Sequence, residues 1–383
     1  MIKALINCRV FDGLELHTGI AVLLEGGKVS ALVPEENIPA TVSDRCDLEG
    51  HILAPGLIDI QVNGGGGVMF NDAPTVDTIR RIGKAHRSFG TTGFLPTLIS
   101  SNFDTMKRAI SAVEQAIAAG VPGVLGIHLE GPFLNADKRG IHRADRFCQP
   151  GKPELELLTS PREGCTLVTL APEVTGNDMI SRLAEQGVLV FGGHSAATFE
   201  QVQVALQAGL RGFTHLFNAM SPYESRSPGM VGAALHDDNS WCGIIADGQH
   251  VHPASFAVAV AAKRKGHSVL VTDAMAGVGS DIKAFVFDGN EIIVKDGSCR
   301  TVSGQLAGSD LDMITAVRNA ASFTGLDSFE ALRMASSYPA HALGLEAQLG
   351  YIRPGFRASF IEVDEDLNLF RTWINGKVEA RRV

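Results

Sequence analysis

Residues 124–130 read Val-Leu-Gly-Ile-His-Leu-Glu, a short apolar run that ends in a carboxylate. Seven other runs have the same form, and they cover residues 53–60, 93–95, 166–171, 188–191, 210–213, 242–245 and 269–272. The polar side chains that follow these seven runs are Gln61, Thr97, Glu173, His194, His215, Asp247 with His250, and Asp273. Uninterrupted apolar runs indicate strands buried on both faces, as in a parallel sheet covered by helices. Eight such units predict an α/β fold, a (β/α)8 barrel of the TIM type, whose active site gathers at the carboxyl ends of the strands.

Helical periodicity fills the segments between these runs. The predicted helices cover residues 75–89, 104–119, 177–186, 198–208, 253–265, 309–323 and 328–343. Both ends of the chain instead contain short strand candidates, at residues 4–10, 19–24, 28–33, 45–48, 359–363, 369–374 and 377–380. Neither end has enough strands for a stable sheet alone. We therefore predict a small β-sandwich domain from residues 1–52 and 350–383. A catalytic barrel follows from residues 53–349, with a hairpin insertion near 284–302.

Composition limits the class of protein. The 383 residues are 45% hydrophobic, which suits one barrel and a smaller second unit. With 33 basic and 42 acidic residues the formal net charge is −9, which argues against a nucleic-acid partner. No apolar stretch reaches the roughly 18 residues of a membrane span, and the first residues lack a signal-peptide pattern. Six scattered cysteines without a CxxC motif indicate reduced thiols in a cytoplasmic protein.

Three metal-ligand side chains end strands on the same rim of the predicted barrel. Glu130 ends the third strand, and His194 and His215 follow the fifth and sixth. One carboxylate and two imidazoles form a three-ligand set for a divalent metal with an open position for water. Zinc fits these ligand types best, although iron, cobalt or manganese are also compatible. Asp273 ends the eighth strand, where an aspartate is well placed to act as a general base.

Several motifs, in this order, carry a resemblance to a known family. They are Ala-Pro-Gly-Leu-Ile-Asp-Ile-Gln-Val-Asn-Gly (54–64), His-Leu-Glu-Gly-Pro-Phe (128–133), Leu-Ala-Pro-Glu (170–173), Gly-His-Ser (193–195), Thr-His-Leu-Phe-Asn-Ala-Met (214–220), Ala-Asp-Gly-Gln-His-Val (246–251), Thr-Asp-Ala (272–274) and Leu-Ala-Gly-Ser (306–309). The chain resembles the amidohydrolase superfamily and, within it, the N-acetylglucosamine-6-phosphate deacetylase family. Many superfamily members carry His-x-His at the end of the first strand, where this chain has Gln-Val-Asn (61–63). The resemblance therefore implies one divalent metal per subunit, held by Glu130, His194 and His215.

The resemblance also implies an activity. It is hydrolysis of the acetamide of N-acetyl-D-glucosamine 6-phosphate, which gives glucosamine 6-phosphate and acetate. The metal and His142 would polarise the amide carbonyl, and Asp273 would act first as base and then as acid. Arg226 and His250 would bind the phosphate, and a neighbouring subunit would take part in these phosphate contacts, which implies a homodimer. The remaining substrate contacts implied by the resemblance are Ile141, Asn218, Ala219, Asp247, Gly248, Gln249, Leu306, Ala307 and Gly308.

Three alternatives remain at this point. An N-acetylgalactosamine-6-phosphate deacetylase would share the same motifs, since the two sugars differ at one hydroxyl. A cyclic amidase of the dihydroorotase or hydantoinase type would normally need the His-x-His that residues 61–63 lack. A non-catalytic sugar-phosphate sensor predicts loss of Asp273 or of a metal ligand, and all four residues are present.

Overall fold

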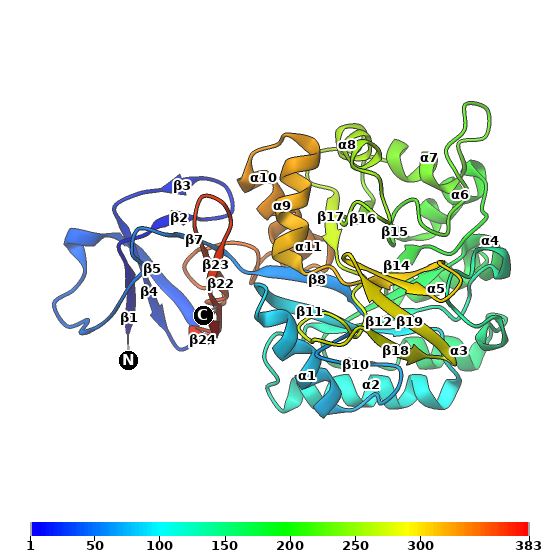
Figure 1. Cartoon of the computed structure of the whole chain (residues 1–383), viewed down its shortest axis with the longest axis horizontal. Coiled ribbons are helices and arrows are strands. Elements are labelled where there is room, and N and C mark those ends of the chain that lie inside the picture. Colours follow the sequence, from blue (N-terminus) through cyan, green and yellow to red (C-terminus); the bar gives the residue numbers. More distant parts are fainter. Residues whose placement is uncertain (1, 382–383) are drawn as a thin grey trace.

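The barrel is present in the computed structural model, which describes residues 2–381 (Figure 1). Its eight strands are β8 (Leu57–Val62), β11 (Thr91–Ile99), β12 (Gly126–Glu130), β13 (Cys165–Leu170), β14 (Leu189–Gly192), β15 (Leu210–Phe213), β16 (Trp241–Ile245) and β17 (Ser268–Val271). Strands adjacent in this order pair in parallel from β8 to β17. The two end strands meet through a parallel bridge between Val62 and Ala274, so the barrel is nearly closed. The apolar runs thus correspond to buried parallel strands.

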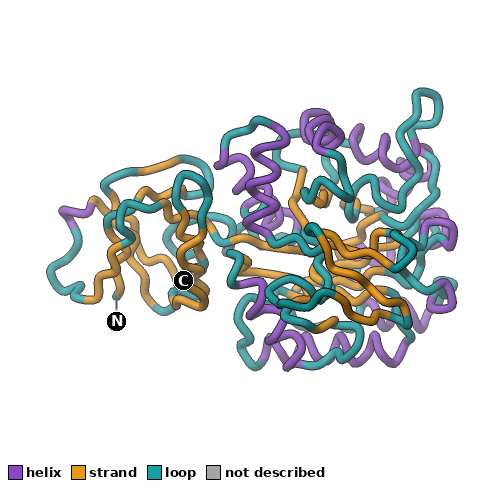
Figure 2. Tube along the Cα trace, in the orientation of Figure 1, coloured by secondary structure: helices purple, strands orange, loops and turns teal. Residues whose placement is uncertain are grey.

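Helices surround this barrel, as the purple segments of Figure 2 show. They are α1 (Val76–Arg87), α2 (Phe103–Ala118), α3 (Lys152–Leu158), α4 (Pro172–Thr175), α5 (Asn177–Glu185), α6 (Phe199–Ala208), α7 (Gly229–His236), α8 (Pro253–Ala262), α9 (Met313–Thr324), α10 (Ser328–Met334) and α11 (Ser337–Ala342). The prediction of a single helix over residues 328–343 is wrong, because this segment forms two helices, α10 and α11. The helix breaks at Ala335, whose carbonyl accepts a hydrogen bond from the Ile58 N–H at 2.7 Å. This contact ties the break to the first barrel strand.

Two sheets at one end of the molecule form the smaller unit. One contains β5 (Lys28–Pro34), β4 (Ile20–Glu25), β1 (Lys3–Ile6) and β6 (Asp44–Asp47). The other contains β24 (Lys377–Arg381), β23 (Leu369–Ile374), β22 (Phe360–Val363), β7 (Ile52–Pro55), β2 (Arg9–Phe11) and β3 (Leu16–His17). Side chains from both sheets, including Leu5, Val22, Phe360 and Trp373, share one core. The second sheet therefore joins the two ends of the chain, as the sequence predicted.

Two predicted strands are each divided in the structure. The strand predicted over residues 4–10 breaks at Asn7, which has a φ of 51°. The run 53–60 also breaks, because β7 pairs with β2 and β22 in the terminal sheet and the barrel strand begins only at Leu57. Gly56 separates these two strands, and a Cβ there would lie 2.2 Å from the Thr92 hydroxyl. Only glycine leaves room for so close an approach.

The predicted hairpin insertion is a four-stranded antiparallel sheet. It consists of β18 (Ala284–Phe287), β19 (Asn290–Lys295), β20 (Ser298–Thr301) and β21 (Leu306–Ser309). Asp-Gly pairs with positive φ form both of its first two turns, at residues 288–289 and 296–297. A bridge between Ala274 and Ser309 attaches this insertion sheet just beyond β17, beside the short hairpin of β9 (Gly64–Gly65) and β10 (Val68–Met69). Among residues 2–381, no helix is long and apolar enough to span a membrane.

Candidate functional site

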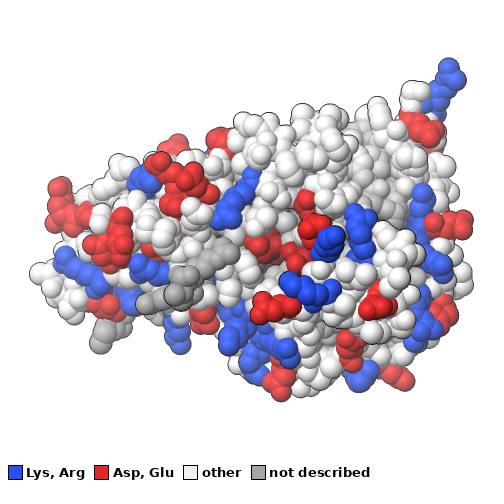
Figure 3. All heavy atoms as spheres, in the orientation of Figure 1, with Lys and Arg blue, Asp and Glu red and all other residues white. Residues whose placement is uncertain are grey.

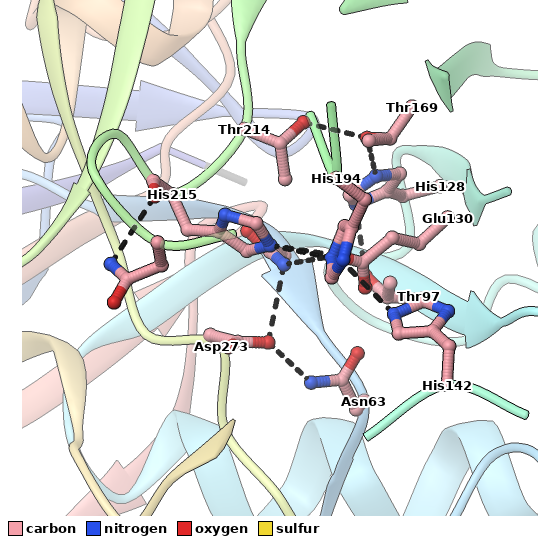
Figure 4. A network of polar contacts seen from close by, with 12 residues as sticks. Asn63, Thr97, His128, Glu130, His142, Thr169, His194, Thr214, His215 and Asp273 are labelled. Atoms are coloured by element: carbon pink, nitrogen blue, oxygen red, sulfur yellow. Dashed lines mark hydrogen bonds and ion pairs between the residues drawn. The ribbon is translucent and has the colours of Figure 1, made fainter. Parts of the chain in front are cut away.

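Glu130, His194 and His215 converge at the carboxyl end of the barrel, and we call them the metal triad. Oε1 of Glu130 lies 3.1 Å from Nε2 of His194 and 3.0 Å from Nε2 of His215, and the two Nε2 atoms are 3.0 Å apart. All three side chains are buried and face one another (Figure 4). Both histidines have positive φ, 48° and 36°, at the second residue beyond their strands. These uncommon backbone conformations turn both rings toward the barrel axis.

The donor set fits a divalent metal. Nδ1 of His194 lies 2.8 Å from the carbonyl oxygen of Lys138, so a neutral ring carries its proton there and its lone pair on Nε2. That lone pair, Nε2 of His215 and the carboxylate oxygen of Glu130 all face one point, which is the arrangement of a metal-ligand set. Ligands held at 2.0–2.2 Å in a tetrahedron are about 3.4 Å apart. A small outward shift from the observed spacing would accommodate the ion.

His142 is the fourth histidine at this site. Its Nε2 lies 3.9 Å from Oε1 of Glu130, and its Nδ1 lies 2.8 Å from the Ser100 hydroxyl. Burial, reinforced by the neighbouring His194, lowers the pKa of His142 to about 3, so the ring is neutral. The Ser100 hydroxyl has one proton, which it can donate either to the carbonyl oxygen of Glu130 at 3.1 Å or to Nδ1 of His142. In the second case the ring carries its own proton on Nε2, beside the metal triad. Sequence reasoning missed Ser100, since nothing distinguishes a serine after a strand.

Asp273 lies on the opposite side of the cavity, where the structure gives it a polar environment. Its Oδ1 accepts hydrogen bonds from Nδ2 of Asn63 at 2.7 Å and from Nε2 of Gln61 at 3.1 Å. Both donors act on Oδ1, which leaves Oδ2 as the oxygen available for a proton. Burial, together with the negative charge of Glu130, raises the pKa of Asp273. The residues that replace His-x-His therefore orient Asp273, a function that sequence reasoning did not assign to them.

One cavity joins these groups with most of the predicted substrate contacts. Its lining includes Ile141, His142, Asn218, Ala219, His250, Leu306 and Gly308, all of them predicted from the sequence. Asp247 does not line the cavity but positions His250, because its Oδ2 lies 2.6 Å from Nδ1 of that ring. Gln249 is exposed and does not line the cavity either. The lining also includes Met275 and Gln305, which the sequence did not single out.

Three further predicted contacts, in addition to Asp247 and Gln249, lie outside the lining of this cavity. Ala307 is buried in the apolar cluster of the insertion sheet rather than facing the cavity. Gly248 lies in the turn between Asp247 and His250. Arg226 is exposed on the loop between β15 and α7, which projects from the barrel in Figure 1. Within its own chain, Arg226 is therefore not part of the cavity wall.

Comparisons with known proteins agree with this geometry. Residues 52–378 match the amidohydrolase family, and residues 3–53 match the NagA composite domain. The N-acetylgalactosamine-6-phosphate deacetylase of Shewanella sp. strain ANA-3 is 46% identical over 85% of this chain and 82% of that protein. The N-acetylglucosamine-6-phosphate deacetylase of Haemophilus influenzae is 33% identical over 98% of each chain.

Solved structures give the same result. The crystal structure of N-acetylglucosamine-6-phosphate deacetylase from Pasteurella multocida is similar over 100% of both chains, with a TM-score of 0.96 and 36% identity. An aspartate-to-alanine variant of the Mycobacterium smegmatis deacetylase, in complex with N-acetyl-D-glucosamine 6-phosphate, covers 99% of both chains with a TM-score of 0.90 and 30% identity. With a family match over most of its length and a buried ligand set at the carboxyl ends of its barrel strands, the chain belongs to the amidohydrolase family.

Proposed function

We propose that this chain hydrolyses the acetamide of N-acetyl-D-glucosamine 6-phosphate to glucosamine 6-phosphate and acetate, in amino-sugar catabolism. The observation that carries the proposal is the convergence of the metal triad, His142 and Asp273 on one cavity. Relatives named as deacetylases of this substrate include those of Haemophilus influenzae and Vibrio furnissii. Zinc is the metal that this nitrogen and oxygen ligand set favours, and iron, cobalt and manganese are compatible with it.

Each of the chain's own residues at the site has a separate role in the reaction. When bound, the metal supplies Lewis acidity at the carbonyl and lowers the pKa of water. In the tautomer with its proton on Nε2, His142 donates a hydrogen bond to the carbonyl oxygen and stabilises the negative charge that develops there. Asp273 removes a proton from the attacking water through Oδ2 and then gives that proton to the departing nitrogen. Asn63 and Gln61 hold Oδ1 throughout, so that Asp273 keeps its orientation in both steps.

We propose that Arg226 acts in a homodimer, where it binds the phosphate in the partner's cavity. Support comes from an apolar groove beside its loop, lined by residues that include Phe199, Tyr223, Pro228 and Val258. The side chains of Tyr223 and Val258 are both 65% exposed in the single chain. A second copy that covered this groove would bury apolar surface and bring the loop to its neighbour.

We also place the protein in the cytoplasm, because all six cysteines are free thiols.

A second candidate substrate is N-acetyl-D-galactosamine 6-phosphate. The observation that favours it is the name of two relatives, since the Shewanella protein and a protein of Escherichia coli O157:H7 at 38% identity are both N-acetylgalactosamine-6-phosphate deacetylases. The two sugars share the acetamide and the phosphate, so the metal triad, His142 and Asp273 would act on both in the same way.

Acetate release from a panel of N-acetylhexosamine phosphates tests the proposal, with metal content measured on the same sample. We expect release from N-acetylglucosamine 6-phosphate, about one metal ion per subunit, and loss of release after chelation. A higher kcat/KM on the galactosamine epimer would select the second candidate. Binding of both sugar phosphates without acetate release, by protein that contains its metal, would contradict the deacetylase proposal.

A further inference from the structure

Arg300 joins the insertion sheet to the loop that carries His250. Its Nη2 donates to the side-chain oxygen of Gln249 at 3.1 Å, and its Nη1 donates to the carbonyl of Gly304 at 3.1 Å. Its Nε donates to the Ser298 hydroxyl at 3.3 Å. The guanidinium group thus spans two segments that are far apart in the sequence, and each segment has a neighbouring residue in the cavity lining.

All three of these acceptors are neutral. Among residues 2–381, no carboxylate forms an ion pair with Arg300, whereas Arg143 pairs with Asp145 and Arg333 with Glu330. Arg300 is also partly buried, so solvent screens its charge incompletely. A guanidinium that lacks a counter-charge attracts an anion, and its planar arrangement of donors matches phosphate oxygens.

Both segments that Arg300 contacts form part of the cavity wall. Gln249 immediately precedes His250, which lines the cavity and is held by Asp247. Gly304 immediately precedes Gln305 and Leu306, which line the cavity from the insertion sheet. On the face drawn in Figure 3, basic and acidic side chains are intermingled over the barrel.

We propose that Arg300 binds the 6-phosphate of the sugar from the same subunit that supplies the metal triad. The inference rests on the proposed function for the identity of the sugar. When the phosphate binds, Nη2 exchanges the amide oxygen of Gln249 for a phosphate oxygen, while Nη1 remains on Gly304. Arg300 thereby adds to the selection of phosphorylated over unphosphorylated sugars from within its own chain, which distinguishes it from Arg226.

A matched pair of variants tests this role in the metal-loaded protein. Arg300→Gln removes the guanidinium, and Lys295→Gln removes one positive charge from an exposed position in the same sheet. We expect Arg300→Gln to raise KM for the phosphorylated sugar about tenfold or more, the value of a charge-assisted hydrogen bond. Its KM for unphosphorylated N-acetylglucosamine should stay unchanged, and Lys295→Gln should change neither value by more than about twofold.

Calorimetric binding of glucose 6-phosphate and of glucose gives a readout that does not depend on turnover. We expect wild-type protein to prefer the phosphorylated sugar, and Arg300→Gln to lose about tenfold of that preference, with Arg300→Lys in between. Equal preference in the wild type and in Arg300→Gln would overturn the inference, as would an equal loss in Lys295→Gln. A parallel fall in kcat on phosphorylated and unphosphorylated sugars would also overturn it, because Arg300 would then only hold the loop in place. Wild-type protein that binds glucose 6-phosphate through Arg300 but releases no acetate would refute the proposed function and leave this inference standing.

Discussion

Replacing Asp59 with asparagine tests how the two end strands of the barrel are held together. Asp59 lies inside β8 with no exposed surface, and it accepts hydrogen bonds from the Thr272 hydroxyl and from the N–H groups of Gln61 and Thr272. Burial outweighs these hydrogen bonds and raises the pKa of Asp59 from 3.8 to about 7. The folded protein therefore binds this proton more tightly than the unfolded chain does.

The sign and size of the effect follow from that difference. The stabilising contribution of the Asp59 proton is complete below about pH 4 and is lost as the pH rises through 7. At 1.36 kcal/mol per pKa unit, the free energy of unfolding should fall by about 3 kcal/mol between pH 5 and pH 8 from this group alone. Asparagine has the same shape and does not titrate, so Asp59→Asn should lack this fall.

Urea unfolding, followed by helical circular dichroism, measures the effect in the wild type and in Asp59→Asn at both pH values. All helices of residues 2–381 longer than one turn lie around the barrel, so this signal reports on the barrel. Every other titrating group is common to the two proteins and cancels in the comparison. Free energies of unfolding that change in parallel, within about 0.5 kcal/mol, would show that Asp59 keeps one protonation state and would refute the reasoning.

The remaining predictions concern the reaction. Asp273→Asn should lower kcat about 10²–10⁴-fold with metal content unchanged, as measured by acetate release and elemental analysis, and near-normal kcat would remove Asp273 from the mechanism. Chelation should abolish acetate release, and added Zn²⁺ should restore it; activity that persists in protein shown to be free of metal would contradict the role of the metal triad. Arg226→Ala should raise KM for the phosphorylated sugar but not for the unphosphorylated one, and an equal rise for both would rule out phosphate binding.

The residues at the carboxyl rim of the barrel could be predicted because the sequence pattern that marks them is local. Each apolar run ends in the polar residue that the barrel must place at its carboxyl rim, so Glu130, His194, His215 and Asp273 were identifiable before any coordinates. The same reasoning failed at Ala335 and at Gly56. At both positions a contact with a distant segment, and not the local apolar pattern, divides the element.

Sequence alone thus determined the fold class and indicated the candidate metal ligands and Asp273, since periodicity and residue type are properties of short segments. Only the tertiary structure decided which donors orient Asp273, that Ser100 contacts His142, and that Arg300 reaches the loop of His250. Each of these contacts joins residues that are from 42 to 212 positions apart in the sequence. No local pattern encodes which side chains the closure of the barrel brings together. The physical reason is that hydrogen bonds at the rim depend on the closure of the whole barrel.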